Sequence, residues 1–204
     1  MKCLPTLVTV LVLLPVVAFG QDSTAKGNAT PFRKGQWAAQ FQAGTAFGSL
    51  GFIKFRSPTR ALVLDLRING SHGETMVTDS SGTRFGDLHS TALTQVRFGS
   101  RRYSGDGTAA KVVSNHSFGA LAGFEHDVAA GPSGWSRTNN WTVGAFGDVG
   151  GTYLVTSRLG IGALSTATLS YQNGITRSSF GNKYHGWSLG GSALSASLVA
   201  TIYF

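Results

Sequence analysis

The sequence predicts an all-β protein, an eight-stranded antiparallel up-and-down transmembrane β-barrel. Three observations predict this fold. From residue 36 onward, apolar and polar residues alternate in eight successive segments, which is the pattern of strands with one apolar face. Short and long connections between these segments nearly alternate, as expected for a barrel with two unlike rims. The chain also contains 28 glycines and 13% charged residues, a composition that favours strands joined by turns.

The residues before the barrel are expected to direct export. Lys2 precedes an apolar stretch from Leu4 to Ala18, and Ala18-Phe19-Gly20 then offers small residues where signal peptidase reads. Cys3 is the single cysteine, so a chain cleaved near Gly20 can form no disulfide and no cysteine zinc site. We predict three segments: a cleaved signal peptide at 1–20, a flexible periplasmic lead-in at 21–35 and a β-barrel domain at 36–204.

The first four predicted strands share an apolar face that alternates with a face of polar residues. The segment 61–69 shows it most clearly, because four aliphatic residues there alternate with Asp65 and Arg67 on the other face. In the segment 50–57, the residues opposite the apolar face are Lys54 and Arg56. The apolar faces are, in order, Trp37, Ala39, Phe41, Ala43 and Phe47; Ile53 and Phe55; Leu62, Leu64, Leu66 and Ile68; and Ala92, Val96 and Phe98.

The last four predicted strands cover 117–127, 140–155, 159–172 and 187–204. The final strand changes parity between Leu189 and Leu194, which predicts a β-bulge around Gly190 and Gly191. The apolar faces are, in order, Phe118, Ala120, Ala122 and Phe124; Trp141, Val143, Ala145, Val149, Tyr153 and Val155; Leu159, Ile161, Ala163, Ala167, Leu169 and Tyr171; and Leu198, Ala200, Ile202 and Phe204.

Alternation alone does not decide whether the apolar face points inward, as in a soluble barrel, or outward to lipid. The polar faces hold charges of both signs, which can pair inside a narrow lumen that side chains fill. Aromatic residues gather near strand ends, as in interfacial girdles. We therefore predict a lumen network of Asp65, Arg67, Arg97, Arg101, Glu125 and Asp127. The predicted girdles contain Trp37, Phe55, Tyr103, Tyr153 and Phe204 at one rim and Phe47, Trp141, Tyr171 and Trp187 at the other.

The final strand carries the most specific pattern in the chain. Apolar residues stand at alternate positions, and the last of them is aromatic. In this pattern, and in its eight strands over 36–204, the chain resembles the small outer-membrane β-barrels of Gram-negative envelopes, the OmpA/OmpX-like class. The resemblance implies an outer-membrane location and recognition of the final strand by the barrel-assembly machinery. The implied assembly signal consists of Leu198, Ala200, Ile202 and Phe204, although the family more often has an aromatic residue in place of Ile202.

The sequence favours a non-enzymatic function. His89 and His116 are each followed by a serine, and a strand places adjacent residues on opposite faces, which is wrong for a shared catalytic site. No cluster of histidine and acidic residues has the spacing of a metal site, so no metal or cofactor is expected. We expect a structural or adhesive role through long extracellular loops at 70–87, 129–140 and 173–186. An open pore is not expected, because side chains fill a lumen of this size.

The expected partners are outer-membrane lipids and, during biogenesis, the barrel-assembly machinery. We expect the protein to be a monomer and to bind no nucleic acid.

Two alternatives stay open. A soluble periplasmic or secreted barrel that binds a small apolar ligand would turn Leu62, Leu64 and Leu66 inward. A lipid A-modifying enzyme would use one of the histidines. Basic residues expected near the periplasmic rim, in contact with lipid phosphates, are Arg33, Lys34, Arg56, Arg60, Arg101, Arg102, Lys111 and Arg158.

Overall fold

The computed structural model describes residues 30–44, 47–78, 82, 84–105, 111–132 and 134–204, so the predicted signal peptide lies outside the described residues. Within this part of the chain, no helix is long and apolar enough to cross a membrane. The strands are β1 (Trp37–Gly44), β2 (Gly48–Ser57), β3 (Arg60–Thr78), β4 (Arg84–Ser104), β5 (Val112–Gly131), β6 (Gly134–Leu154), β7 (Leu159–Ser178) and β8 (Lys183–Tyr203).

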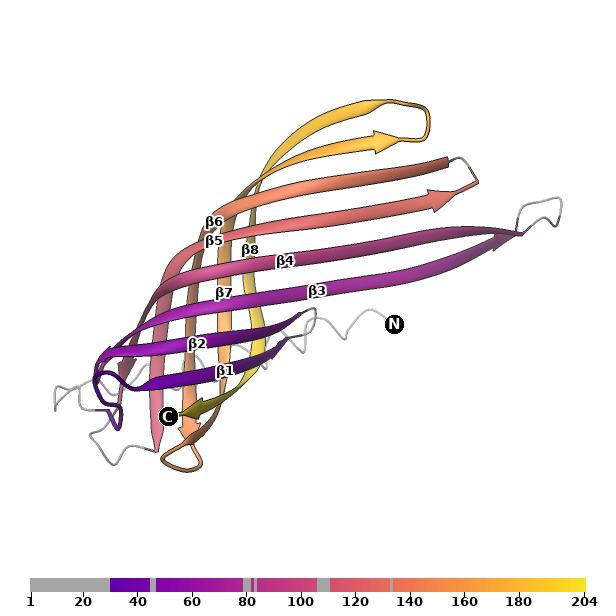
Figure 1. The fold of residues 1–204 in the computed structure, drawn as a ribbon. Coiled ribbons are helices and arrows are strands. Elements are labelled where there is room, and N and C mark those ends of the chain that lie inside the picture. Colours follow the sequence, from indigo (N-terminus) through magenta and orange to yellow (C-terminus); the bar gives the residue numbers. More distant parts are fainter. Residues whose placement is uncertain (1–29, 45–46, 79–81, 83, 106–110, 133) are drawn as a thin grey trace.

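The eight strands form one closed barrel in which each strand pairs antiparallel with its neighbours in sequence (Figure 1). The barrel closes between β1 and β8, where the register runs from Ala38 opposite Tyr203 to Gly44 opposite Ser197. The start of β1 and the end of β8 therefore lie at the same end of the barrel, which we call the terminal end. The opposite end is the hairpin end. The predicted all-β fold, an eight-stranded antiparallel up-and-down barrel, is confirmed.

The strands are staggered around the ring. A row of paired residues that starts at Ala38 passes through Val63, Gly119 and Thr168 and reaches β8 at Ser192. Ala38 itself, however, pairs with Tyr203. This offset between Ser192 and Tyr203 is the shear of the barrel, and it requires strands that are strongly tilted to the barrel axis.

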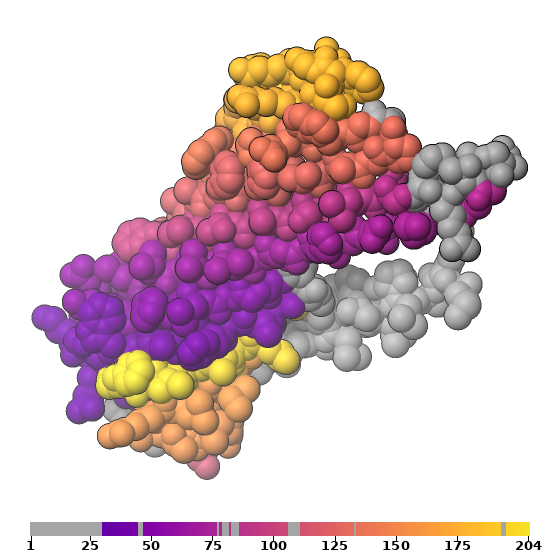
Figure 2. Space-filling model, turned by 45° about the vertical axis from the view of Figure 1, so that its right-hand side comes forward, coloured from indigo at the N-terminus to yellow at the C-terminus, as the bar shows by residue number. Residues whose placement is uncertain are grey.

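The three long loops predicted at 70–87, 129–140 and 173–186 are mostly strand, which corrects the prediction. β3 and β4 stay paired as far as Thr78 and Arg84, and β5 and β6 as far as Gly131 and Gly134. Polar residues occupy both faces of these segments, so the period-two pattern is lost although the backbone still pairs. β1 and β2 have only 8 and 10 residues. The three long hairpins thus extend beyond them (Figures 1 and 2).

The parity change predicted in the last strand corresponds to a β-bulge. Thr166 pairs with Ser195, whereas Thr168 pairs with Ser192, so β8 holds one more residue than β7 across this interval. An extra residue reverses which face the following side chains occupy. For this reason Trp187 and Leu189 point outward on one side of the bulge, and Leu198 and its alternate neighbours do so on the other.

The predicted orientation of β2 is wrong. Ile53 and Phe55 are each 1% exposed and face the lumen, whereas Lys54 and Arg56 face outward. The outward apolar residues of this strand are instead Leu50 and Phe52. The reason is that the lumen at the terminal end is lined by apolar side chains, so the apolar residues of β2 face inward there and the charged residues face outward, the reverse of the usual assignment for a membrane barrel.

An aromatic layer fills the lumen at the terminal end. Phe32 precedes β1 and packs at centroid distances of 4.5 Å from Phe55, 5.0 Å from Tyr103 and 5.1 Å from Tyr203. It is 4% exposed, and the Thr30 hydroxyl donates a hydrogen bond to the carbonyl of Pro58. Within the predicted flexible lead-in, Thr30 and Phe32 are therefore packed against the barrel, whereas Arg33, Lys34 and Gly35 are exposed. Phe55 and Tyr103 belong to this layer and not to an outer girdle.

Candidate functional site

Above the aromatic layer, charged side chains from three strands meet inside the lumen. The inward positions of β3 and β4 carry Asp65, Arg97 and Arg101, and the inward face of β6 carries Asp148. These four residues are at most 2% exposed. Alternation puts them there, because each is flanked in its strand by residues that face outward. The lumen network is therefore a buried ionic layer across the barrel.

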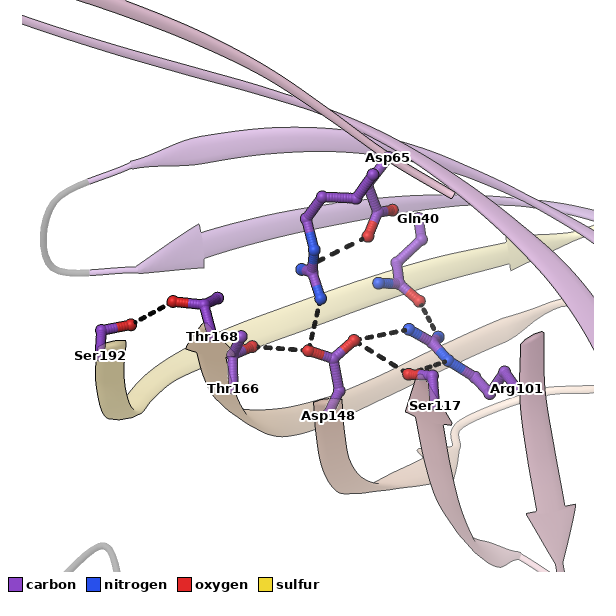
Figure 3. A network of polar contacts seen from close by, with 9 residues as sticks. Gln40, Asp65, Arg101, Ser117, Asp148, Thr166, Thr168 and Ser192 are labelled. Carbon is purple, nitrogen blue, oxygen red and sulfur yellow. Dashed lines mark hydrogen bonds and ion pairs between the residues drawn. The ribbon is translucent and has the colours of Figure 1, made fainter. Parts of the chain in front are cut away.

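Asp148 is the main acceptor of this layer (Figure 3). Its Oδ1 accepts hydrogen bonds from Arg97 Nη2 at 2.6 Å and from the Thr166 hydroxyl at 2.8 Å. Its Oδ2 accepts one from the Ser117 hydroxyl at 2.9 Å and lies 3.9 Å from Arg101 Nη2. Four side chains from β4, β5 and β7 thus converge on one carboxylate of β6, and it ties these strands together across the lumen.

The two arginines have further partners on other strands. Arg101 Nη1 donates a hydrogen bond of 2.5 Å to Oε1 of Gln40 on β1. Arg97 Nη1 lies 3.7 Å from Oδ2 of Asp65 on β3. The Arg97 guanidinium also stacks over the ring of Phe146, with 3.6 Å between its central carbon and the ring centroid. Each of these two guanidinium groups is therefore held by groups from more than one other strand.

Glycines make room for this layer. A Cβ atom on Gly119 would clash with the carbonyl oxygen of Phe98 and would lie 2.8 Å from the Phe146 ring. Gly99, its partner on β4, is equally close to that ring. The paired glycines therefore form a flat patch on which Phe146 lies, and Phe146 in turn supports Arg97.

Arg67 occupies a different environment from the other arginines. It is 7% exposed, and its guanidinium lies 4.3 Å from the ring of Phe47. Among the described residues, no carboxylate lies within salt-bridge distance of it. Three arginines and two aspartates thus share the buried lumen. Phe47, predicted in an outer girdle, instead covers Arg67.

Glu125 and Asp127 do not join the ionic layer, which corrects the prediction. They lie on the inward face of β5 but nearer the hairpin end, where they are half-buried. Glu125 accepts a hydrogen bond of 3.1 Å from the Asn140 amide, and Asp127 accepts one from the Thr91 hydroxyl. Their parity is as predicted, but their position along the strand puts them too far from the arginines.

The sequence prediction missed Asp148, Gln40, Ser117 and Thr166 as members of the network. The alternation of β6 does place Asp148 on the polar face, so the signal was present. It could have been found by asking which acid balances Arg97 and Arg101, because buried charges need partners.

The outer surface carries an apolar band that ends in aromatic residues. Outward residues such as Phe98, Val143 and Leu169 are 56–60% exposed. At the terminal end, Trp37, Tyr153 and Phe204 are exposed. Toward the hairpin end, Phe124 lies 4.8 Å from Trp141 and Tyr171 lies 6.5 Å from Trp187, between ring centroids. The predicted assembly-signal residues of β8 lie on the same surface, with Leu198, Ile202 and Phe204 exposed and Ala200 half-buried.

The histidines show no catalytic arrangement among the described residues. His89 Nε2 lies 3.1 Å from the Thr91 hydroxyl and 3.9 Å from Asp127 Oδ1. Because the same ring nitrogen faces both groups, Asp127 does not orient His89 through its second nitrogen as a general base requires. His126 faces outward and contacts Asn139. The described residues also contain no group of three or more side chains that could hold a metal ion.

Comparison with known proteins finds matches among solved structures only. No family model matches the chain, and no curated protein matches it. Among solved structures, it is similar to a major outer membrane protein from Thermus thermophilus, with a TM-score of 0.54 and 12% sequence identity. The match covers 83% of this chain and 98% of that chain. At this identity the likeness shows the fold alone, so the chain has the all-β barrel fold of that outer membrane protein.

Proposed function

We propose that the protein is an outer-membrane β-barrel with a structural or adhesive, non-enzymatic role. The observation that carries this proposal is the distribution of residues over the closed barrel. Its outer surface is apolar between two sets of aromatic residues, and its buried charges lie inside. The largest contiguous apolar patch on a soluble monomer is on the order of 300–600 Å². An apolar band that surrounds a whole barrel is far larger than such a patch. Lipid is the environment that such a surface fits.

The same distribution disfavours a soluble barrel that binds an apolar ligand. That alternative requires Leu64 and Leu66 to face the lumen, but they are 45% and 40% exposed on the outside. Between them, Asp65 is fully buried inside. The lumen is filled at this level by the ionic layer and below it by the aromatic layer, and neither is a site for an apolar molecule. The two layers also support a sealed lumen and not a general pore.

The hairpin end supports the adhesive part of the proposal. An open concavity of about 450 Å³ lies among β4, the end of the β5–β6 hairpin and the turn between β7 and β8. Asp87 and His89 of β4 line it, together with Trp135 of β6 and Phe180 from the turn between β7 and β8. Trp135 and Phe180 are 47% and 77% exposed. Exposed aromatic residues around a concavity are typical of surfaces that bind other molecules.

Membrane fractionation tests the proposed location. We expect the protein to sediment with outer membranes, to need detergent for solubility and to migrate differently on gels before and after heating. Protease added to intact cells should cut only at the hairpin end, for example near 132 and 179–182. Full solubility without detergent would contradict the proposal, as would cleavage of intact cells at the turn near 156–158.

We propose that the OmpA/OmpX-like pattern of β8 serves as an assembly signal. Phe204 is 73% exposed on the outer surface, where a recognition factor can reach it, and the strand pairs with β1 to close the barrel. A tag of several charged residues added after Phe204 should therefore lower the amount of protein inserted in membranes. The same tag placed before Thr30 is the control. Equal insertion of the two tagged proteins would contradict the signal while leaving the fold unaffected.

A further inference from the structure

The barrel wall has a notch where two of its eight strands stop early. β1 ends at Gly44 and β2 begins at Gly48, and within the described residues β3 beyond Ile68 pairs only with β4. Likewise β8 before Ser197 pairs only with β7. We define the notch by these two edges, 69–78 of β3 and 183–196 of β8. Figure 2 shows β3 and β4 extending past the ends of β1 and β2.

Part of the notch lies below the aromatic residues of the hairpin end. Trp187 stands next to Tyr171 in that set, and within the described residues the edge of β8 that faces away from β7 has no paired strand from there down to residue 196. If the aromatic residues mark the membrane interface, the segment 188–196 lies within the apolar zone. Unpaired backbone N–H and C=O groups cost several kcal/mol each in hydrocarbon. The edge therefore needs a partner that both donates and accepts hydrogen bonds.

The lumen beside the notch is lined by hydroxyl and amide groups. Thr168 and Ser192 share a hydrogen bond of 2.7 Å, and the Ser188 hydroxyl donates one of 3.4 Å to Gln172. Ser188, Gly190 and Ser192 are exposed although they face inward. On the next strands, Thr138 and Thr176 share a further hydrogen bond of 2.9 Å. This lining does not suit an acyl chain, since polar groups lose their hydration without compensation.

The charges near the notch are divided by face. On the inner face toward the hairpin end, the charged residues among those described are the acids Asp87, Glu125 and Asp127. Arg137, Arg177 and Lys183 alternate with the inward residues and point outward. Arg67 lies deeper, and Phe47 covers it. The inner face thus repels an anionic group that enters through the notch.

From these observations we infer that the notch admits the head group of an uncharged, hydroxyl-rich amphiphile, such as a glycoside, whose apolar tail stays in the bilayer. Hydroxyl groups donate and accept, so they satisfy both the edge of β8 and the lining of Ser188 and Ser192. The ionic layer around Asp148 closes the lumen beneath, so the head group is held and does not pass to the terminal end. The inference rests on the proposed membrane location.

Two glycines allow a clean test. A Cβ atom on Gly190, which faces into the notch, would meet nothing within 4 Å, and the same holds for Gly48, which faces outward at the end of β2. Gly190→Trp should therefore fold and fill the notch, whereas Gly48→Trp adds the same side chain away from the lumen. Heat-modifiable migration of both variants after refolding checks that the barrel has formed.

The probes are three photoreactive compounds added to the refolded protein in lipid vesicles. One is an alkyl glucoside with the photoreactive group on its sugar, one is an alkyl phosphate with the same tail, and one is the sugar without a tail. We expect the glucoside to label 183–192 in the native chain and in Gly48→Trp, and to lose this labelling in Gly190→Trp. The phosphate should label these residues only after Glu125→Gln and Asp127→Asn are combined. The free sugar should not label them.

Three results would overturn the inference. One is glucoside labelling that is equal in Gly190→Trp and native protein. Another is labelling confined to outward residues around the whole barrel, because the glucoside then behaves like any lipid that surrounds the protein and does not enter the notch. The third is labelling by the free sugar as strong as by the glucoside, which removes the role of the tail. A protein that inserts in membranes but shows any of these results refutes the inference and leaves the proposed function intact. A protein that does not insert refutes both.

Discussion

Replacing Asp148 with alanine is expected to lower the free energy of unfolding by about 3–5 kcal/mol, the usual cost of removing one partner of a buried ion pair. Asp148 is 1% exposed and accepts from Arg97, Ser117 and Thr166. Without it, Arg97 keeps only the longer contact to Asp65, and Arg101 loses its carboxylate. The three buried arginines of the lumen are then left with one buried acid, Asp65. Urea unfolding in lipid vesicles, followed by tryptophan fluorescence, measures the loss.

Two further variants separate charge from packing in this experiment. Asp148→Asn keeps the side-chain volume and removes the charge, so it should lower the free energy of unfolding almost as much as Asp148→Ala does. Glu125→Ala removes an acid from the same lumen but from a half-buried position with one amide partner, and should cost about 0.5–1.5 kcal/mol. If Asp148→Asn unfolds at the same urea concentration as the native protein, charge pairing does not hold the lumen together.

Placing arginine at Phe118 is expected to destabilise the inserted barrel by about 2–4 kcal/mol, the cost of a cation on the lipid face near the bilayer midplane. Phe118 is 64% exposed and pairs with Gly147, which lies midway along β6 between the exposed residues Trp141 and Tyr153. In water the same substitution of an exposed side chain would be nearly neutral. The effect therefore depends on lipid around the barrel.

Val112→Arg is the matched control for this substitution. Val112 lies on the same strand and the same outward face, but it pairs with Tyr153 at the terminal end. A cation near the interface should cost about 0–1 kcal/mol. The difference between the two variants, measured by urea unfolding in vesicles, reports depth in the membrane. Equal and small losses for both would contradict a membrane-spanning barrel.

Sequence patterns predicted this fold well where one face is apolar and the other polar. In β3, Leu64 and Leu66 point outward and Asp65 inward as predicted, because alternation and environment agree there. The pattern failed in β2, because the aromatic layer makes the lumen apolar at that level, so the apolar residues Ile53 and Phe55 face inward and the charged residues face outward. It also failed in the hairpins, where water on both sides removes the need for an apolar face, although the backbone remains paired.

The ionic layer was only partly predictable for a related reason. Parity tells which face a residue occupies, but not its height along the barrel. Glu125 and Arg97 share the inward face, yet the register separates them, since Arg97 pairs with Leu121 and not with Glu125. Asp148 comes to Arg97 from a strand two places away in the ring. Such contacts depend on the shear of the barrel, which no single segment of sequence encodes.

The aromatic layer has a consequence for the order in which the molecule can form. Phe32 stands before the first strand and Tyr203 stands in the last, and their rings stack 5.1 Å apart. The closing pairs between β1 and β8 likewise join the two ends of the barrel sequence. A growing chain therefore cannot complete its interior until its final residues have been made, and bringing such distant segments together carries a large entropic cost. The aromatic layer at the terminal end can therefore be complete only after β8 has paired with β1.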